Sequence, residues 1–481
     1  MNSAKSAILV TTVSNAMMKL ISFVASIVLA RLLTPAEIGT FSVAVAFIAL
    51  AQMFRDLGIG NYLVQEKELT RERFRSAASI TLIAAWTIGI LILLVSDLFA
   101  GFYQEQGLSS ILQVLAFNFF LIPLASPVLS LLKRNMEFKV LAGIHLMAAA
   151  VHSMTSIVLA LAGFGYMSLA WGAVAGIVVT LLGATTFWSR TGMGSRMICL
   201  IPFLAEWKRV LPFSTKSFGT NLLGTLGEHT SDFVVGRVFG FHALGLYSRG
   251  QGLIDHMNGV LFSAIQAVAF PRFSELLRHG QDIKEPYLRG LSYLALIQWP
   301  AFIFIAVFAQ PLILLLFGEQ WLGAVPFLQI LAIGGIFSTL SGLAPGLLLS
   351  MGEAGYNLRA QVLIQTLRIT LILLAATQGL VWVAVAQVAT YLFQLLLYSK
   401  YIKQLVNLDY VELLAVLSCS IKIVLISSLP GGLVLFYGQQ QVNFPTMLIC
   451  AAATFCLWIA SIRLFKHPFY NELFQIHPKI G

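Results

Sequence analysis

Residues 11–42 read TTVSNAMMKLISFVASIVLARLLTPAEIGTFS, and residues 217–248, which lie 206 positions later, read SFGTNLLGTLGEHTSDFVVGRVFGFHALGLYS. The two stretches agree at six positions, Arg31/Arg237 and Gly39/Gly245 among them, where composition alone predicts roughly two or three matches. Both are apolar segments, and the matching Arg and Gly lie near the end of each. This excess of matches indicates a chain that was built by duplication.

Composition places the chain in a membrane. Hydrophobic residues make up 58% and charged residues 10%, against about 25% charged residues in ordinary soluble domains. Apolar runs of about 20 residues recur, and each is long enough to cross a hydrocarbon core of about 30 Å as a helix. We therefore predict an all-α polytopic membrane protein with about fourteen spans: 8–30, 39–60, 77–99, 109–132, 140–161, 168–188, 211–235, 249–270, 290–309, 323–350, 360–377, 381–399, 411–430 and 443–462.

Lys and Arg cluster in alternate connections between these spans. With the amino terminus in the cytoplasm, the basic residues fall in cytoplasmic segments such as 67–75, 133–139 and 272–289, whereas the opposite loops contain Arg31 and Arg237. The positive-inside rule then places both termini in the cytoplasm. The formal charge of +10 is explained by topology and by attraction to anionic membrane lipids, so no nucleic-acid partner is expected.

The repeat divides the spans into lobes. Six spans separate the two copies, an even number, so both copies cross the membrane in the same direction and are related by a pseudo-two-fold axis along the membrane normal. The predicted parts are a six-helix lobe at 1–190, a cytoplasmic linker at 191–210, a second six-helix lobe at 211–403, and two additional spans with a tail at 404–481. Repeats of this kind are typical of transporters, whose substrate path lies between the halves.

Enzyme and motor motifs are absent from the sequence. It contains no His-Glu-x-x-His, no Gly-x-x-x-x-Gly-Lys and no Cys-x-x-Cys motif. We therefore expect no metal site, no cofactor and no ATP motor. An ion gradient, the membrane potential or the substrate gradient would then drive any transport.

One polar stripe runs along the first span and recurs at the same offset in the seventh. Spacings of three and four residues put the members on one helical face, which we expect to line a hydrated cavity rather than lipid. Small hydroxyl residues can also simply join helices, which is the alternative for Thr11, Ser22 and Ser217. The stripes comprise Thr11, Asn15, Lys19, Ser22 and Ser26 in one copy, and Ser217, Asn221, Thr225, Glu228 and Asp232 in the other.

Further ionisable residues within spans are mainly cations. Lys19, Arg55, Arg249 and Arg368 suit an anionic group such as a phosphate, because Arg can fork two phosphate oxygens. Asp56, Glu228 and Asp232 are candidates for ion coupling. Pairing between neighbours, as in Arg55 with Asp56, and snorkelling at span ends are the structural alternatives.

Several motifs resemble a known family. Residues 30–35 (ARLLTP) with Gly39, residues 56–60 (DLGIG), Phe270-Pro271 and residues 317–319 (FGE) with Trp321 are similar in order and spacing to polysaccharide exporters of the multidrug/oligosaccharidyl-lipid/polysaccharide superfamily. The likeness covers nearly the whole chain and is greatest to the O-antigen and colanic-acid exporter type. Ala25 and Ser26 stand where the peptidoglycan-precursor branch carries an arginine-aspartate pair.

The resemblance implies an alternating-access flippase, not an enzyme. Its expected substrate is an undecaprenyl-pyrophosphate-linked oligosaccharide, moved across the bacterial inner membrane for O-antigen, exopolysaccharide or capsule. Expected partners are that lipid, membrane lipids, a coupling proton or sodium ion, and polymerase or chain-length proteins. A cation-coupled multidrug exporter is the nearest alternative, and a membrane-embedded polymerase or acyltransferase the next.

Overall fold

The computed structural model describes residues 2–56, 58–188, 203–436 and 444–470, and within this part of the chain every regular element is helical. Twelve described segments are long and apolar enough to cross a membrane. The long helices α8 (Trp207–Val238) and α9 (Gly240–Arg278) also occupy predicted spans, and some of their side chains lie outside the described residues. The all-helical prediction is confirmed, and the described helices are compatible with about fourteen spans.

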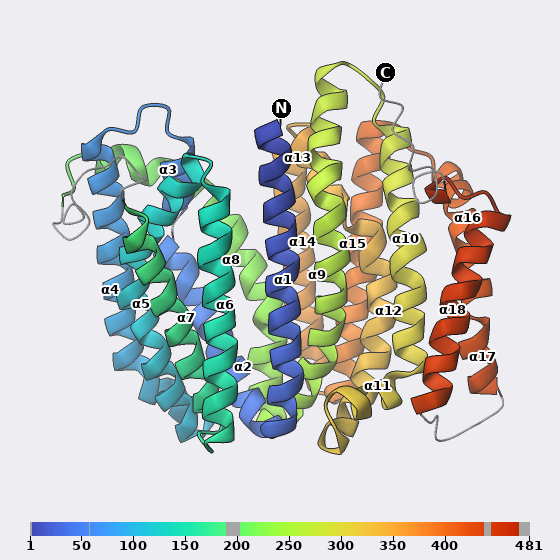
Figure 1. Ribbon diagram of the computed structural model, residues 1–481, viewed down its shortest axis with the longest axis horizontal. Coiled ribbons are helices and arrows are strands. Elements are labelled where there is room, and N and C mark those ends of the chain that lie inside the picture. The colour runs from blue at the N-terminus through green and yellow to red at the C-terminus, as the bar shows by residue number, and fades with distance from the viewer. Residues whose placement is uncertain (1, 57, 189–202, 437–443, 471–481) are drawn as a thin grey trace. The chain divides into compact units, whose positions relative to one another are not determined.

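Seven α-helices are described before residue 189, and Figure 1 shows α4 to α7 running side by side. α6 packs along α7 and α1, and α4 packs along α5. The short α3 lies against α5, beyond the end of α2. The bounds are α1 (Asn2–Leu32), α2 (Pro35–Asp56), α3 (Ile59–Gln65), α4 (Arg71–Tyr103), α5 (Gln106–Arg134), α6 (Phe138–Leu161) and α7 (Met167–Thr186).

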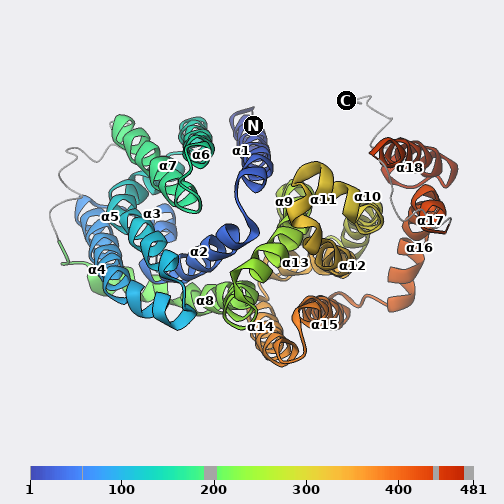
Figure 2. The same cartoon turned by 90° about the horizontal axis from the view of Figure 1, so that it is seen from below.

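The helices after α9 form a second set. α12 packs between α10 and α15, α15 packs on α14, and α16 joins α10 to α18. In Figure 2, α16, α17 and α18 lie together as a group. The bounds are α10 (Lys284–Val307), α11 (Ala309–Leu316), the 3-10 helix η3 (Glu319–Ala324), α12 (Val325–Ser341), α13 (Ala344–Ser350), α14 (Ala354–Ala376), α15 (Leu380–Val406), α16 (Tyr410–Ser427), α17 (Leu429–Phe436) and α18 (Phe444–Leu464).

Packing divides the chain into two compact units, Met1–Gly245 and Leu246–Gly481. The first includes α8, which packs on α2, α3 and α4. Grouping by packing therefore differs from grouping by the repeat, which assigns residues from 211 onward to the second lobe. The lobe and linker boundaries at 190, 210 and 403 stay a prediction.

Local chemistry explains where α1 ends and α2 begins. The Thr34 hydroxyl accepts a hydrogen bond from the Glu37 backbone N–H at 3.3 Å, and the Glu37 carboxylate accepts one from the Thr34 backbone N–H at 2.8 Å. This is a capping box, in which two side chains satisfy backbone donors at a helix start. Pro35 occupies the first helical position, where its missing N–H costs nothing. The sharp reversal between the two spans is thus encoded in four residues.

The two glycines of the repeat lie where its two copies cross. A Cβ on Gly39 would lie 1.9 Å from the Phe241 carbonyl oxygen, and a Cβ on Gly245 would lie 1.8 Å from the Pro35 carbonyl oxygen. Phe241 and Pro35 are themselves equivalent positions, 206 residues apart. Each copy therefore presents a glycine to the same point on the backbone of the other copy. Only glycine permits this approach.

Candidate anion-binding site

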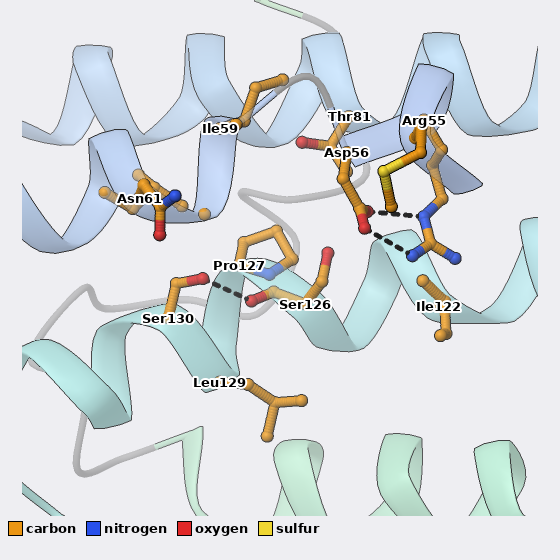
Figure 3. A pocket seen from close by; sticks show the side chains of 14 residues that line it. Arg55, Asp56, Ile59, Asn61, Thr81, Ile122, Ser126, Pro127, Leu129 and Ser130 are labelled. Carbon is orange, nitrogen blue, oxygen red and sulfur yellow. Dashed lines mark hydrogen bonds and ion pairs between the residues drawn. The ribbon is translucent and has the colours of Figure 1, made fainter. Parts of the chain in front are cut away.

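A pocket of about 430 Å³ opens at the end of α2, within the first compact unit (Figure 3). Its walls come from the last turn of α2, from α3, from Thr81 of α4 and from the second half of α5. The volume lies within the range of about 300–1,000 Å³ that small-molecule pockets occupy. The lining residues are Met53, Arg55, Asp56, Gly58, Ile59, Gly60, Asn61, Leu63, Thr81, Ile122, Ser126, Pro127, Leu129 and Ser130.

Arg55 is the buried cation of this pocket. Arg55 is 6% exposed, and its Nε and Nη2 donate hydrogen bonds to the two carboxylate oxygens of Asp56 at 2.7 and 2.9 Å. The guanidinium also lies over the Phe119 ring, 5.6 Å from its centroid. Its Nη1 is buried and has no hydrogen-bond partner among the described residues. Asp56 thus holds one edge of the guanidinium, and one buried donor is left without a partner among the described residues.

The chain beyond α2 is shaped to form the pocket wall. Gly58 has φ of 76°, a left-handed conformation that starts α3 abruptly. Arg134, at the end of α5, donates hydrogen bonds to the backbone carbonyls of Leu63, Val64 and Glu66 at 3.2, 3.2 and 2.6 Å. A further bond reaches Lys67 at 3.3 Å. This single side chain satisfies the carbonyls at the end of α3 and fixes that helix against α5.

Hydroxyl and amide groups line the pocket together with the cation. Ser130 and Thr81 donate their hydroxyl protons to backbone carbonyls of their own helices, at Ser126 and Ala77. In Figure 3, the Arg55–Asp56 pair lies on one side of the pocket, and Asn61 and Ser130 lie on the other. A guanidinium nitrogen with hydroxyl and amide groups nearby is suited to an oxyanion such as a phosphate. Sequence reasoning identified Arg55 and Asp56 but missed Asn61, Thr81, Ser126 and Ser130, whose signal was only their polarity within or beside apolar segments.

The other two predicted arginines lie in the second compact unit, in different surroundings. Arg368 of α14 is 6% exposed, lies 5.9 Å from the Tyr391 ring centroid, and its Nε has no hydrogen-bond partner in the described part of the chain. Arg249 of α9 lies 5.0 Å from the Phe317 ring centroid and 4.9 Å from that of Trp321. Two aromatic faces therefore hold Arg249, which stabilises the turn between α11 and α12.

The polar stripes are only partly described. In α1, Lys19 and Ser26 are half-buried and Asn15 is exposed, and the Ser26 hydroxyl donates to the Phe23 carbonyl of its own helix at 2.8 Å. In α8, Thr225 is half-buried and Glu228 is exposed, while the side chain of Asn221 lies outside the described residues. Substrate contact by these residues stays a prediction.

Asp232 has a partner within its own helix. Its carboxylate lies 2.9 Å from Nδ1 of His229, one turn earlier. The sequence placed His229 beside the acidic Glu228, but the structure pairs it with Asp232. No group of three or more His, Cys, Asp and Glu side chains within the described residues could hold a metal ion. The roles of Asp56, Glu228 and Asp232 in ion coupling stay a prediction.

Several proteins of polysaccharide biosynthesis are similar to this chain in sequence. Two curated relatives are the teichuronic acid biosynthesis protein TuaB of Bacillus subtilis (strain 168), 25% identical over 72% of this chain and 70% of that protein, and the lipopolysaccharide biosynthesis protein WzxC of Escherichia coli (strain K12), 23% identical over 70% and 67%. The succinoglycan biosynthesis transport protein ExoT of Rhizobium meliloti (strain 1021) is 26% identical over 68% and 65%.

Solved structures share the fold at low sequence identity. The lipid II flippase MurJ in an inward closed conformation matches with a TM-score of 0.76 and 13% identity, over 97% of this chain and 99% of that chain. An inward-facing multidrug resistance MATE family transporter matches with a TM-score of 0.64 and 14% identity, over 81% and 94%. The chain is therefore a multi-pass membrane protein with the fold that MurJ and the MATE transporters share.

The model of one protein family matches most of the sequence directly. The match covers residues 28–326 and is described as polysaccharide biosynthesis protein. It begins in α1 and ends in α12, so it includes the second half of the first repeat copy, the whole second copy and the whole pocket around Arg55. The protein belongs to the polysaccharide biosynthesis protein family.

Proposed function

We propose that the protein is a flippase that moves a polyprenyl-pyrophosphate-linked oligosaccharide from the cytoplasmic to the outer leaflet of a bacterial inner membrane, with both termini in the cytoplasm. Membership of the polysaccharide biosynthesis family supports this function, as do relatives named for lipopolysaccharide biosynthesis and succinoglycan transport. The fold shared with a lipid II flippase supports alternating access. The product would serve surface polysaccharide synthesis, where polymerase and chain-length proteins are the expected partners.

The observation that carries the proposal is the buried, incompletely bonded guanidinium of Arg55. Asp56 holds two of its nitrogens, and Nη1 has no hydrogen-bond partner in the described part of the chain although its pocket is large enough for a pyrophosphate. A pyrophosphate oxygen at Nη1 would satisfy that donor with a charge-assisted hydrogen bond. Arg368, also deeply buried with an unpartnered Nε among the described residues, is the second cation proposed to attract the substrate. Lys19 and Arg249 complete the proposed cationic set.

Transport by purified protein in liposomes tests this function. Wild-type protein is expected to move an undecaprenyl-pyrophosphate-linked oligosaccharide between leaflets, which a membrane-impermeant glycosidase detects. Arg55→Ala should reduce the rate at least tenfold, and Arg55→Lys should restore little, because an ammonium cannot hold Asp56 in a fork and also reach a phosphate. Arg272→Ala is the matched control, since Arg272 is exposed and bonds only Glu275 among the described residues.

The outcomes separate function from site. Wild-type liposomes that never translocate the oligosaccharide would remove the flippase proposal, and export of a cationic dye instead would support the multidrug alternative. Normal transport by Arg55→Ala would remove only the pocket from the mechanism. Rates measured with imposed proton or sodium gradients, in Asp56→Asn, Glu228→Gln and Asp232→Asn, would identify the coupling ion and its carboxylate.

A further inference from the structure

A second cavity lies in the same bundle, between α2, α5, α6 and α7. Its volume is about 520 Å³. Most of its wall is apolar and is formed by small or aliphatic side chains, together with the ring of Phe41. Its polar lining residues are Gln52, Asn118, His152 and Thr180. No Lys, Arg, Asp or Glu is among its lining residues.

Asn118 is buried in the wall with its hydrogen bonds incomplete. The residue is 4% exposed, and its Oδ1 has no hydrogen-bond partner among the residues that the structure describes. Buried amide oxygens in proteins almost always have a partner. Thr180 donates its proton to the Gly176 carbonyl at 3.0 Å, so its oxygen is left as an acceptor. The cavity thus offers acceptors and amide donors without a net charge.

Two glycines of α7 position the third polar group. A Cβ on Gly176 would lie 3.2 Å from Cβ of His152, and a Cβ on Gly172 would lie 2.9 Å from the His152 carbonyl oxygen. These glycines let α7 approach α6 closely at the level of His152, whose side chain lines the cavity. His145, one heptad earlier on α6, is exposed and lines neither cavity.

The two cavities follow one another along the same two helices. On α2, Gln52 lines the neutral cavity and Met53 and Arg55 line the cationic pocket. On α5, Asn118 lines the neutral cavity, and Ile122, one helical turn later, lines the pocket. Phe119, between them, packs beneath the Arg55 guanidinium. A cationic site is therefore followed, within about one turn of helix or roughly 5 Å, by a neutral polar one.

We propose that this neutral cavity binds the sugar units nearest the pyrophosphate of the substrate, an inference that rests on the proposed flippase function. A sugar joined directly to a pyrophosphate at Arg55 would lie one helical turn away, where the cavity begins. Amides accept and donate at once, which matches neighbouring sugar hydroxyls. The mainly apolar wall with a few polar groups is typical of sites for small neutral ligands. A polyprenyl tail would leave Asn118 unsatisfied, and a second phosphate would find no cation.

Binding of two synthetic lipids in detergent tests the proposal. One is a bare ten-carbon isoprenyl pyrophosphate. The other is the same lipid with a single sugar on its pyrophosphate, made in three versions that carry glucose, galactose or N-acetylglucosamine. Wild-type protein should bind the best sugar-bearing lipid at least tenfold more tightly than the bare one. Asn118→Leu and Thr180→Val should each bind the bare lipid as wild type does and lose most of that tenfold gain. Arg55→Ala should weaken the binding of both lipids.

Matched variants control for general damage to the bundle. Gln113→Leu removes another amide of α5, one that bonds Ser96 and Ser109 outside both cavities, and should keep the full gain. His145→Leu should keep it, whereas His152→Leu should lose part of it. Retained affinity for the bare lipid shows that each variant is folded.

The results distinguish this inference from the function on which it rests. Equal wild-type affinity for bare and sugar-bearing lipids, with all three sugars, would overturn the sugar site while leaving Arg55 and transport intact. So would a full gain in both Asn118→Leu and Thr180→Val. Failure of wild-type protein to bind either lipid would instead count against the flippase function itself.

Discussion

Arginine side chains do three different things in this protein. Arg134 satisfies four backbone carbonyls, Arg249 lies over two aromatic rings, and Arg55 and Arg368 are deeply buried. Arg55, Arg249 and Arg368 each leave one buried nitrogen unbonded among the described residues. The sequence grouped Arg249 and Arg368 together as cations within spans. Only their surroundings distinguish an arginine that holds the fold from one that is available to a ligand.

Arg134 should be essential to stability. Replacing it with Ala leaves the carbonyls at the end of α3 without donors, and hydrogen bonds from a charged group contribute about 1.5–3 kcal/mol each at most. Because the site is half-buried and water replaces part of the loss, we expect Arg134→Ala to cost about 2–4 kcal/mol of unfolding free energy. Lys133→Ala, at the exposed neighbour, should cost little. Thermal unfolding in detergent measures both, and equal midpoints would contradict the role of Arg134.

Arg368 and Arg249 should respond oppositely to the same change. Arg368→Met replaces a deeply buried guanidinium, for which no ion pair is seen in the described residues, so the midpoint of thermal unfolding should hold or rise while transport falls at least tenfold. Arg249→Met removes two cation–π contacts and should lower stability by about 1–2 kcal/mol. The thermal unfolding midpoint and the transport rate, both measured on each variant, check these two expectations. Strong destabilisation by Arg368→Met would assign that residue to the fold instead.

At the scale of elements, the crossing of α2 and α9 at Gly39 and Gly245 leaves no room for a larger side chain. A methyl group at Gly39 or Gly245 would overlap a carbonyl oxygen at less than 2 Å, and overpacking of this kind typically costs about 1–3 kcal/mol or more. We expect Gly39→Ala and Gly245→Ala to destabilise the protein by similar amounts. Gly252→Ala, also in α9 but with open space around its Cβ, should be neutral or stabilising. The yield of purified protein and the midpoint of thermal unfolding test this prediction. A Gly39→Ala variant with the wild-type midpoint would show that the two helices can separate at this crossing.

Hydropathy predicted an all-helical chain, and the described long helices are compatible with its fourteen spans, because each span must satisfy its own backbone in lipid. It predicted ends less well: α9 runs over 240–278 rather than 249–270, since polar residues extend a helix beyond the apolar run. Neither the short α17 nor the division of 323–350 into α12 and α13 was expected. These breaks depend on Pro, Gly and packing rather than on hydropathy.

The candidate site could be predicted only in part. Charges within apolar spans stand out in the sequence, so Arg55 and Asp56 were found. Asn118, Ser126 and Ser130 did not stand out, because a single amide or hydroxyl in a span more often joins helices than binds a ligand. Their role depends on which helices face one another, and that is information about packing. The sequence placed Arg134 only within the basic segment 133–139, since a side chain that binds carbonyls leaves no spacing pattern.

At the scale of the whole molecule, His467 fastens the end of the described chain to α10 and α16. It is 1% exposed, its Nδ1 accepts a hydrogen bond from the Phe469 N–H at 3.2 Å, and its Nε2 lies 2.9 Å from Oγ of Ser292 and 3.1 Å from Oγ of Ser420. Because a backbone N–H can only donate, Nδ1 must be unprotonated and Nε2 must carry the proton. The neutral imidazole therefore joins segments that are far apart in sequence.

Acid should loosen this attachment. Burial lowers the pKa of His467 from 6.5 to about 4, so the folded protein binds fewer protons than the unfolded chain in that range. The stabilisation is therefore complete above pH 6.5 and is lost as the pH falls toward 4. We expect the unfolding midpoint of wild type to drop more between pH 7 and pH 4.5 than that of His467→Gln. His279→Gln, at an exposed histidine, should retain the wild-type pH dependence, and identical curves for His467→Gln and wild type would contradict the assignment.

The reciprocal crossing of Gly39 and Gly245 also has a consequence for how this molecule arose. Each glycine contacts the backbone of the residue equivalent to the one that the other contacts, which is the arrangement of an isologous interface between identical subunits. A gene encoding a single copy would have supplied both sides of this contact by pairing with itself. The duplicated chain would then be a homodimer fused end to end, and the two glycines would be inherited from one ancestral codon.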